Sequence, residues 1–149
     1  MGSVKSSGEI KKIALAFDRA LEKKDLQRVI DRFDDGCEIE LLNIKLLGKD
    51  GGKKWFKWLF KHIKNLKLKP ITIMVDENVF FEEFIVEATF HDGKKAYSKQ
   101  AEVLVFEDSK IKSLRLYFDR LDFSDSVTKD IISRTIAKQL IKKSLEGLT

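Results

Sequence analysis

The sequence is poor in the residues that build disulfide frameworks and metal centres. Its 149 residues include one cysteine, Cys37, and two histidines, His62 and His91. One cysteine cannot form an intrachain disulfide, and one cysteine with two histidines leaves too few soft ligands for a structural zinc site. The sequence also contains no phosphate-binding loop and no dinucleotide-binding fingerprint. We therefore expect neither a metal nor a cofactor.

Long apolar runs are missing as well. No stretch approaches the ~20 apolar residues of a membrane span, and the start, MGSVKSSGEIKK, lacks the apolar core of a signal peptide. Hydrophobic residues make up 43% of the chain and charged residues 36%, which is typical of a soluble globular protein. We expect a single domain over residues 1–149 in the reducing cytoplasm, with no membrane partner.

Positive charge gathers in one stretch. Residues 49–69 hold eight lysines against one acid, Asp50, so this stretch carries a charge of +7. The remaining chain carries −2, which gives the net charge of +5. Side chains at helical spacing form one apolar stripe along it, made of Trp55, Trp58, Leu59, His62, Ile63 and Leu66. A basic helix with interleaved tryptophans is also compatible with nucleic-acid binding. The stripe favours a helix with a solvated lysine face, and we do not expect a nucleic-acid partner.

Hydrophobic periodicity predicts the order α-α-β-α-β-β-β-β-α. Apolar residues at helical spacing predict two helices before residue 37, and Asp25 is a candidate N-cap for the second, shorter one. Residues 37–44 are then predicted as a strand. The lysine-rich helix is expected to end at Pro70. Alternation then predicts four strands, at residues 71–75, 79–90, 96–106 and 110–123, and an amphipathic helix over residues 125–146 closes the chain. The fold class is α+β, with helices packed on a strongly curved antiparallel sheet.

Three segments, placed in that order, resemble the SnoaL-like branch of the nuclear transport factor 2 superfamily. They read FDRALEKKDLQRVIDRFDDGCEIEL, GKDGGKKWFKWLF and VFEDSKIKSLRLYFDRLDF, and the resemblance covers residues 9–125. It implies a cone-shaped barrel with a pocket between the concave sheet face and the helices, and a homodimer formed through the sheet. The superfamily also includes ketosteroid isomerases and limonene epoxide hydrolases, so it does not imply one chemistry.

The resemblance also places the catalytic positions of the epoxide hydrolases on this chain. Their closing-strand Asp falls at Leu116, their middle-strand Arg and Asp at Glu83 and Ile85, and their Tyr and Asn at Ile39 and Leu41. The hydrolase pattern is thus absent at all five positions. Together with strand parity and the helical stripe, the resemblance implies a pocket lined by Phe17, Ile39, Leu41, Trp55, Trp58, Leu59, Ile85, Leu114, Leu116 and Phe118.

The strand at residues 79–90 has two possible orientations. The register implied by the family turns Glu83, Ile85 and Glu87 toward the pocket, whereas burial alone would turn Phe84, Val86 and Ala88 toward it. In the first orientation Glu83 and Glu87 are candidate general acids or bases, with His62 as a partner. The dimer face is then expected at Phe84, Val86, Arg115, Tyr117 and Asp119.

Three functions follow as hypotheses. The first is binding of a small hydrophobic molecule in the cone without the epoxide-hydrolase residues. The second is an isomerase, cyclase or dehydratase that uses a pocket glutamate for proton transfer. The third is a dimeric interaction module whose basic helix contacts an acidic partner.

Overall fold

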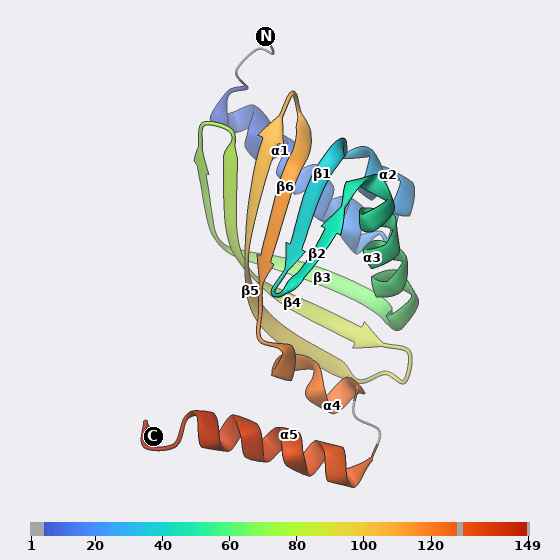
Figure 1. Ribbon diagram of the computed structural model, residues 1–149, viewed down its shortest axis with the longest axis vertical. Helices are drawn as coiled ribbons and strands as arrows, with labels where there is room; N and C mark the ends of the chain where they lie inside the picture. The colour runs from blue at the N-terminus through green and yellow to red at the C-terminus, as the bar shows by residue number, and fades with distance from the viewer. Residues whose placement is uncertain (1–4, 128–129, 149) are drawn as a thin grey trace.

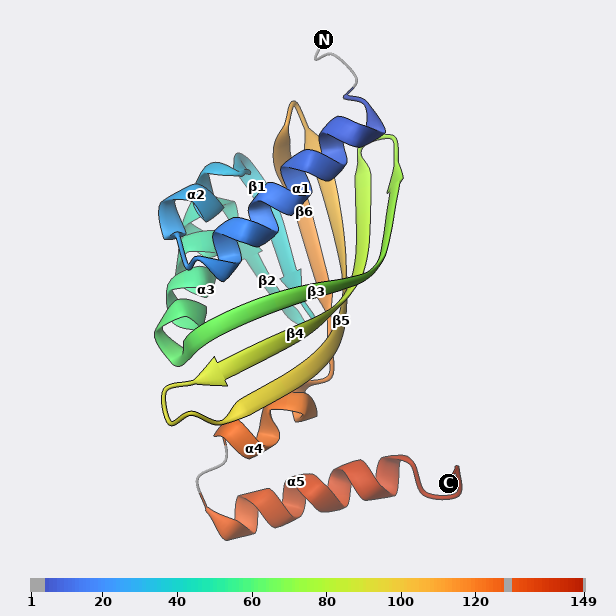
Figure 2. The ribbon, with the colours of Figure 1, turned by 180° about the vertical axis from the view of Figure 1, so that it is seen from behind.

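The computed structural model describes residues 5–127 and 130–148. A mixed six-stranded sheet curves around the helices, and α1 crosses its concave face (Figures 1 and 2). The order of elements is α1 Ser7–Glu22, α2 Leu26–Asp31, β1 Phe33–Leu41, β2 Ile44–Leu47, α3 Gly48–His62, β3 Ile63–Asp76, β4 Val79–Phe90, β5 Lys95–Glu107, β6 Lys110–Tyr117, the 3-10 helix η1 Arg120–Phe123, α4 Ser124–Val127 and α5 Ile131–Ser144.

The α+β class and the expected order of helices and strands are confirmed, with β2 added as a short partner of β1. Asp25 caps α2 as expected, because its side chain accepts a hydrogen bond from the Arg28 amide. The sheet is mixed rather than wholly antiparallel, since β1 pairs with β6 in parallel. The long β3–β6 meander returns the chain beside β1 in the same direction, and the resulting strand order is β2-β1-β6-β5-β4-β3. The sheet is therefore open, with β2 and β3 at its edges.

The prediction that the lysine-rich helix extends to Pro70 is wrong. The helix ends at His62, and residues 63–76 form β3. Leu66 and Leu68 alternate with lysines there, so the same residues fit a period of two as well as the helical stripe. Pro70 is tolerated because β3 is an edge strand and its register with β4 shifts between Pro70 and Thr72.

The packed core lies between α1, α3 and the concave side of the sheet. The rings of Phe17, Phe33 and Phe56 meet there with centroids 5.5–6.2 Å apart, and each side chain is at most 1% exposed. These edge-on and tilted contacts between fully buried rings form a packed core. The core adjoins a cavity, which Phe56 also lines.

The closing helix expected over residues 125–146 is interrupted. A short α4 ends at Val127, and α5 begins at Ile131 after Asp130, whose carboxylate accepts a hydrogen bond from the Ser133 amide at 2.7 Å. Residues 128–129 of the expected helix lie outside the described residues. The α5 helix lies beyond the end of the sheet (Figure 1), and four of its apolar side chains are more than half exposed: Ile131, Ile132, Ile136 and Leu140.

Candidate functional site: a cone cavity with buried carboxyl groups

A cavity of about 470 Å³ lies between the helices and the sheet. Helices α1 and α3, strands β3–β6 and the segment from Phe118 to Ser126 all contribute to its wall. Aromatic and aliphatic side chains make up most of it, and its polar members are Asp18, His62, Gln100, Glu102 and Ser126. The volume and the apolar wall suit a small organic molecule.

Three carboxyl groups meet at the inner end of this cavity. Asp18 comes from α1, Glu82 from β4 and Glu102 from β5, and they are 7%, 1% and 5% exposed. Glu82 and Glu102 are directly opposite each other across the β4–β5 ladder. Asp18 and Glu102 line the cavity, while one oxygen of Asp18 (Oδ2) and one of Glu82 (Oε2) are buried without a hydrogen-bond partner.

Burial and mutual repulsion change the protonation of this carboxyl cluster of Asp18, Glu82 and Glu102. Burial, followed by the charges of Glu102 and Glu82, raises the pKa of Asp18 to about 10. Burial, reinforced by the charge of Glu82, raises the pKa of Glu102 to about 8. Burial also raises the pKa of Glu82, and a hydrogen bond with Asp18 partly opposes that rise. Asp18 therefore holds a proton at neutral pH and donates it toward Glu82.

A chain of polar side chains connects the cavity wall to the segment after β6. The Gln100 amide donates to the Ser98 hydroxyl at 3.2 Å, and that hydroxyl donates to a carboxylate oxygen of Asp122 at 2.7 Å. Ser98 is buried, and Asp122 belongs to η1. This connection holds η1, with the cavity-lining Phe123, against β5.

His62 stands at the end of α3 beside Trp58, with the two ring centroids 4.7 Å apart. Its Nδ1 donates a hydrogen bond to the carbonyl oxygen of Trp58 at 2.7 Å. When the ring is neutral, Nε2 is therefore the acceptor nitrogen. His62 and Trp58 both line the cavity, and both are exposed, so they lie at its solvent side.

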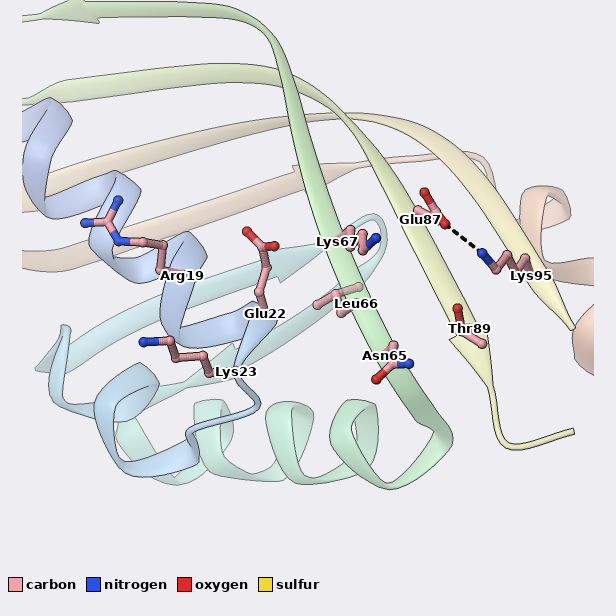
Figure 3. Close-up of a pocket in the computed structure, with 9 residues that line it drawn as sticks. All are labelled: Arg19, Glu22, Lys23, Asn65, Leu66, Lys67, Glu87, Thr89 and Lys95. Atoms are coloured by element: carbon pink, nitrogen blue, oxygen red, sulfur yellow. Dashed lines mark hydrogen bonds and ion pairs between the residues drawn. The ribbon is translucent and has the colours of Figure 1, made fainter. Parts of the chain in front are cut away.

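A second hollow, of about 510 Å³, lies between α1 and strands β3–β5 (Figure 3). Most of its lining side chains are charged, and Glu87 is neutralised there by Lys69 at 3.0 Å and Lys95 at 3.1 Å. Hydrogen bonds from Lys69 and Lys95 lower the pKa of Glu87. A carboxylate stabilised in its charged form by two lysines is a poor proton donor near neutral pH.

The structure places the predicted lining residues in three groups. Six of the ten line the cavity, and they are Leu41, Trp55, Trp58, Leu59, Leu116 and Phe118. Phe17, Ile39 and Leu114 are fully buried in the packed core. Ile85 points to the convex side of the sheet, where alternate residues of β4 are less buried.

The orientation of β4 is the one favoured by burial rather than by the family register. Phe84 and Val86, expected at the dimer face, are instead buried and line the cavity. Of the candidate catalytic acids, Glu83 is half-buried on the convex side, and Glu87 is buried in the second hollow beside Lys69 and Lys95, so neither lines the cone cavity. Among the other expected dimer-face residues, Arg115 and Tyr117 are on the convex side, and Asp119 caps η1 by accepting from the Leu121 amide.

Sequence reasoning missed the carboxyl cluster, although each member carries a signal. Asp18 is four residues after Ala14 and three before Leu21, on the apolar face of α1. Glu82 and Glu102 stand on the strand faces that also carry Phe80, Phe84, Leu104 and Phe106. A charged residue on an otherwise apolar face is the pattern that identifies a buried acid.

No protein-family model and no curated protein match this chain. Solved structures do match it. One is an NTF2-like protein of unknown function from Burkholderia pseudomallei, with a TM-score of 0.73 and 16% identity, covering 81% of this chain and 98% of that chain. A second is an LEH-like epoxide hydrolase from M. tuberculosis, with a TM-score of 0.70 and 17% identity, covering 91% of this chain and 98% of that chain. A third is SalBIII, an epoxide hydrolase/cyclase-like enzyme with a role in pyran ring formation in the polyether salinomycin, with a TM-score of 0.69 and 15% identity, covering 77% of this chain and 94% of that chain.

These likenesses establish the fold. The chain adopts the nuclear transport factor 2-like cone, the fold that SnoaL-like and ketosteroid isomerase-like proteins also have. Among the residues that the structure describes, no helix is both long and apolar enough to span a bilayer.

Proposed function

We propose that this chain binds a small, mainly apolar molecule in the cone cavity. The observation that carries the proposal is the cavity itself, about 470 Å³ in volume and walled mostly by aromatic and aliphatic side chains. Burying apolar surface in such a space contributes ~25 cal/mol per Å². The few polar groups at the inner end would fix the orientation of the bound molecule.

Binding can be followed with a neutral probe, 4-phenyl-1-butanol, by calorimetry and by tryptophan fluorescence, since Trp55 and Trp58 are in the cavity wall. The Val86→Phe variant fills part of the cavity and should weaken binding at least tenfold. Val103→Phe adds the same ring to the convex side of the sheet, where Val103 is half-buried, and should leave affinity unchanged. Equal effects of the two variants, or no binding of the probe to the unaltered protein, would contradict the proposal.

The carboxyl cluster supports proton transfer as a second candidate function. A carboxyl group whose pKa lies near neutral pH both donates and accepts a proton readily, and Glu102 is such a group at the edge of the cavity. In this role Glu102 would exchange a proton with a carbon or oxygen atom of the bound molecule. Asp18, which keeps its proton, would donate a hydrogen bond to a developing negative charge.

Hydrogen exchange tests this second candidate. The probe is 4-phenyl-2-butanone in heavy water, with deuterium entry beside the carbonyl followed by NMR at pH 8. Enzyme-dependent exchange should be lost in Glu102→Gln and kept in Glu83→Gln, whose side chain is on the other face of the sheet. Exchange that survives Glu102→Gln would overturn the role of Glu102.

We further propose that two copies of the chain associate through the convex face of the sheet. Four large side chains are about half exposed on the sheet, and they are Ile71, Met74, Tyr97 and Tyr117. An apolar group of this kind is typical of a protein–protein contact.

A further inference from the structure

The polar end of the cone cavity carries acids and, among the residues that the structure describes, no lysine or arginine. Its lining includes two carboxyl groups, Asp18 and Glu102, with Glu82 directly behind them. Glu87, the other buried acid among the described residues, has cationic neighbours in Lys69 and Lys95. The carboxyl cluster differs because its neighbours supply no positive charge.

The cluster also receives little hydrogen bonding from outside itself. Asp18 Oδ2 and Glu82 Oε2 are buried and have no donor other than the proton that Asp18 shares with Glu82, and Asp18 is 93% buried against the cavity. The side-chain amide of Gln100, which also lines the cavity, donates to Ser98 instead. A buried acceptor without an outside donor is destabilising, so a bound group that donates hydrogen bonds or carries positive charge would relieve that destabilisation.

The wall leading to these acids is aromatic. Six rings besides His62 line the cavity, namely Trp55, Phe56, Trp58, Phe84, Phe90 and Phe118, and Phe123 adds a seventh at η1. The faces of such rings attract organic cations, and an apolar wall favours a ligand with a hydrocarbon body over a hydrated metal ion. Acid at the inner end and aromatic rings along the wall select the same class of molecule.

From this arrangement we propose that the cavity ligand is an organic cation: an amine or quaternary ammonium compound with an apolar body, its charged nitrogen directed at Asp18 and Glu102. The inference rests on the proposed binding function and narrows it to one ligand class. On binding, one carboxylic acid of the cluster gives its proton to water and the resulting carboxylate faces the ammonium group. Apart from this proton transfer, which breaks the carboxyl O–H bond and forms an O–H bond to water, no covalent bond changes.

Proton release gives the binding a definite dependence on pH. The groups that face Glu102 are Asp18 from α1, Glu82 from β4, Gln100 from β5 and Leu116 from β6, with Glu22 further along α1 and His62 across the cavity. The two nearest titratable groups are acids, and they disfavour a second negative charge. Affinity for a quaternary ammonium should therefore rise as pH rises from 6 to 8, up to tenfold per pH unit, as Glu102 becomes easier to ionise.

Three probes with one hydrocarbon body test the proposal by calorimetry at pH 8: (4-phenylbutyl)trimethylammonium, 4-phenyl-1-butanol and 5-phenylpentanoate. We expect the ammonium to bind at least tenfold more tightly than the alcohol, and the carboxylate most weakly. The double variant Asp18→Asn/Glu102→Gln should remove the advantage of the ammonium and keep binding of the alcohol. Glu83→Gln is the matched control and should change neither, while thermal unfolding verifies that each variant is folded.

The outcomes separate this inference from the function on which it rests. If the alcohol binds in a Val86-dependent manner and the ammonium binds no better, the ligand class is wrong and the binding pocket stands. If none of the three probes binds, both proposals fail. An ammonium advantage that persists in the double variant would also overturn the inference, since the charge preference would then arise elsewhere.

Discussion

Glu82 and Glu102 are directly opposite each other on adjacent strands, and both side chains are turned into the interior of the cone. Two carboxylates in this relationship would repel each other strongly, so the protein can hold them only when protons are retained. The neighbouring Asp18 adds a third acid. Three buried acids lower the stability of the folded protein. Destabilising buried groups of this kind are typical of functional sites.

This arrangement makes the stability of the protein depend on pH in an unusual direction. Glu102 binds its proton with a pKa of about 8 in the folded state and 4.5 in the unfolded chain. Between these values the folded state holds more protons, so the free energy of unfolding falls as pH rises, by up to ~1.4 kcal/mol per pH unit for this group. Urea unfolding at pH 5, 6, 7 and 8 measures the slope.

The Glu102→Gln variant should be more stable than the unaltered protein at pH 8, by about 1–3 kcal/mol, because a neutral amide replaces an acid that resists ionisation. The difference should shrink toward pH 5. Glu83→Gln should follow the unaltered protein at every pH, since Glu83 is on the convex side. A Glu102→Gln variant that is less stable at pH 8 would show that the buried carboxylate is stabilised by contacts other than those described here.

Ser98 should control how firmly η1 closes the side of the cavity. In Ser98→Ala the hydroxyl that joins Gln100 to Asp122 is lost, and the buried Gln100 amide loses its acceptor. We expect a loss of about 1–3 kcal/mol in unfolding free energy and a faster release of a cavity probe. Stopped-flow dissociation of the probe measures the second effect, with Ser109→Ala, in the β5–β6 turn, as the control. An unchanged release rate would mean that η1 does not limit exit.

The aromatic core should tolerate truncation far less than the cavity wall. Phe17→Ala removes a ring that is 0% exposed and contacts Phe33 and Phe56, so it should cost about 3–5 kcal/mol. Trp58→Ala removes a ring that is 58% exposed at the solvent side of the cavity and should cost under ~1 kcal/mol while weakening probe binding. Equal losses of stability would contradict the division between core and cavity.

Association through the convex face is testable by sedimentation. We expect a species of twice the 17.2 kDa chain mass, and Tyr97→Glu/Tyr117→Glu should convert it to the monomer, because both rings are more than half exposed there. Charge placed on α3 by Lys57→Glu should have no effect on mass. A monomer in the unaltered protein, or a dimer that persists in the double variant, would overturn this face as the contact.

The sequence predicted the order of elements and the parity of β6, because both follow from hydrophobic spacing. Leu114 and Leu116 alternate with Arg115 and Tyr117, and the structure buries the first pair and not the second. The end of α3 was not predictable in the same way. Residues 63–68 satisfy both a helical and a strand period, and only pairing with β4 decides between them.

The position of the acids was harder to predict. A carboxylate on a strand is normally solvated, so the sequence alone favours surface positions for Glu82 and Glu102. Their burial can be predicted only when it is known which face of β4 and of β5 turns toward the core. A register shift of one residue exchanges Glu82 for Glu83, and the family register favoured the wrong one. Burial alone favoured the right face, since Phe80, Phe84 and Val86 share it with Glu82. The cluster with Asp18 further depends on how α1 crosses the sheet, which no local pattern encodes.

The most direct test of the account is a carboxyl-carbon NMR titration of the glutamates, with Glu102 and Glu82 assigned by their Gln variants. We predict that Glu102 titrates near pH 8, that Glu82 titrates above its ordinary range, and that both signals move when (4-phenylbutyl)trimethylammonium is added. Glu102 and Glu82 titrating near 4.5, with no response to the ammonium probe, would contradict the account.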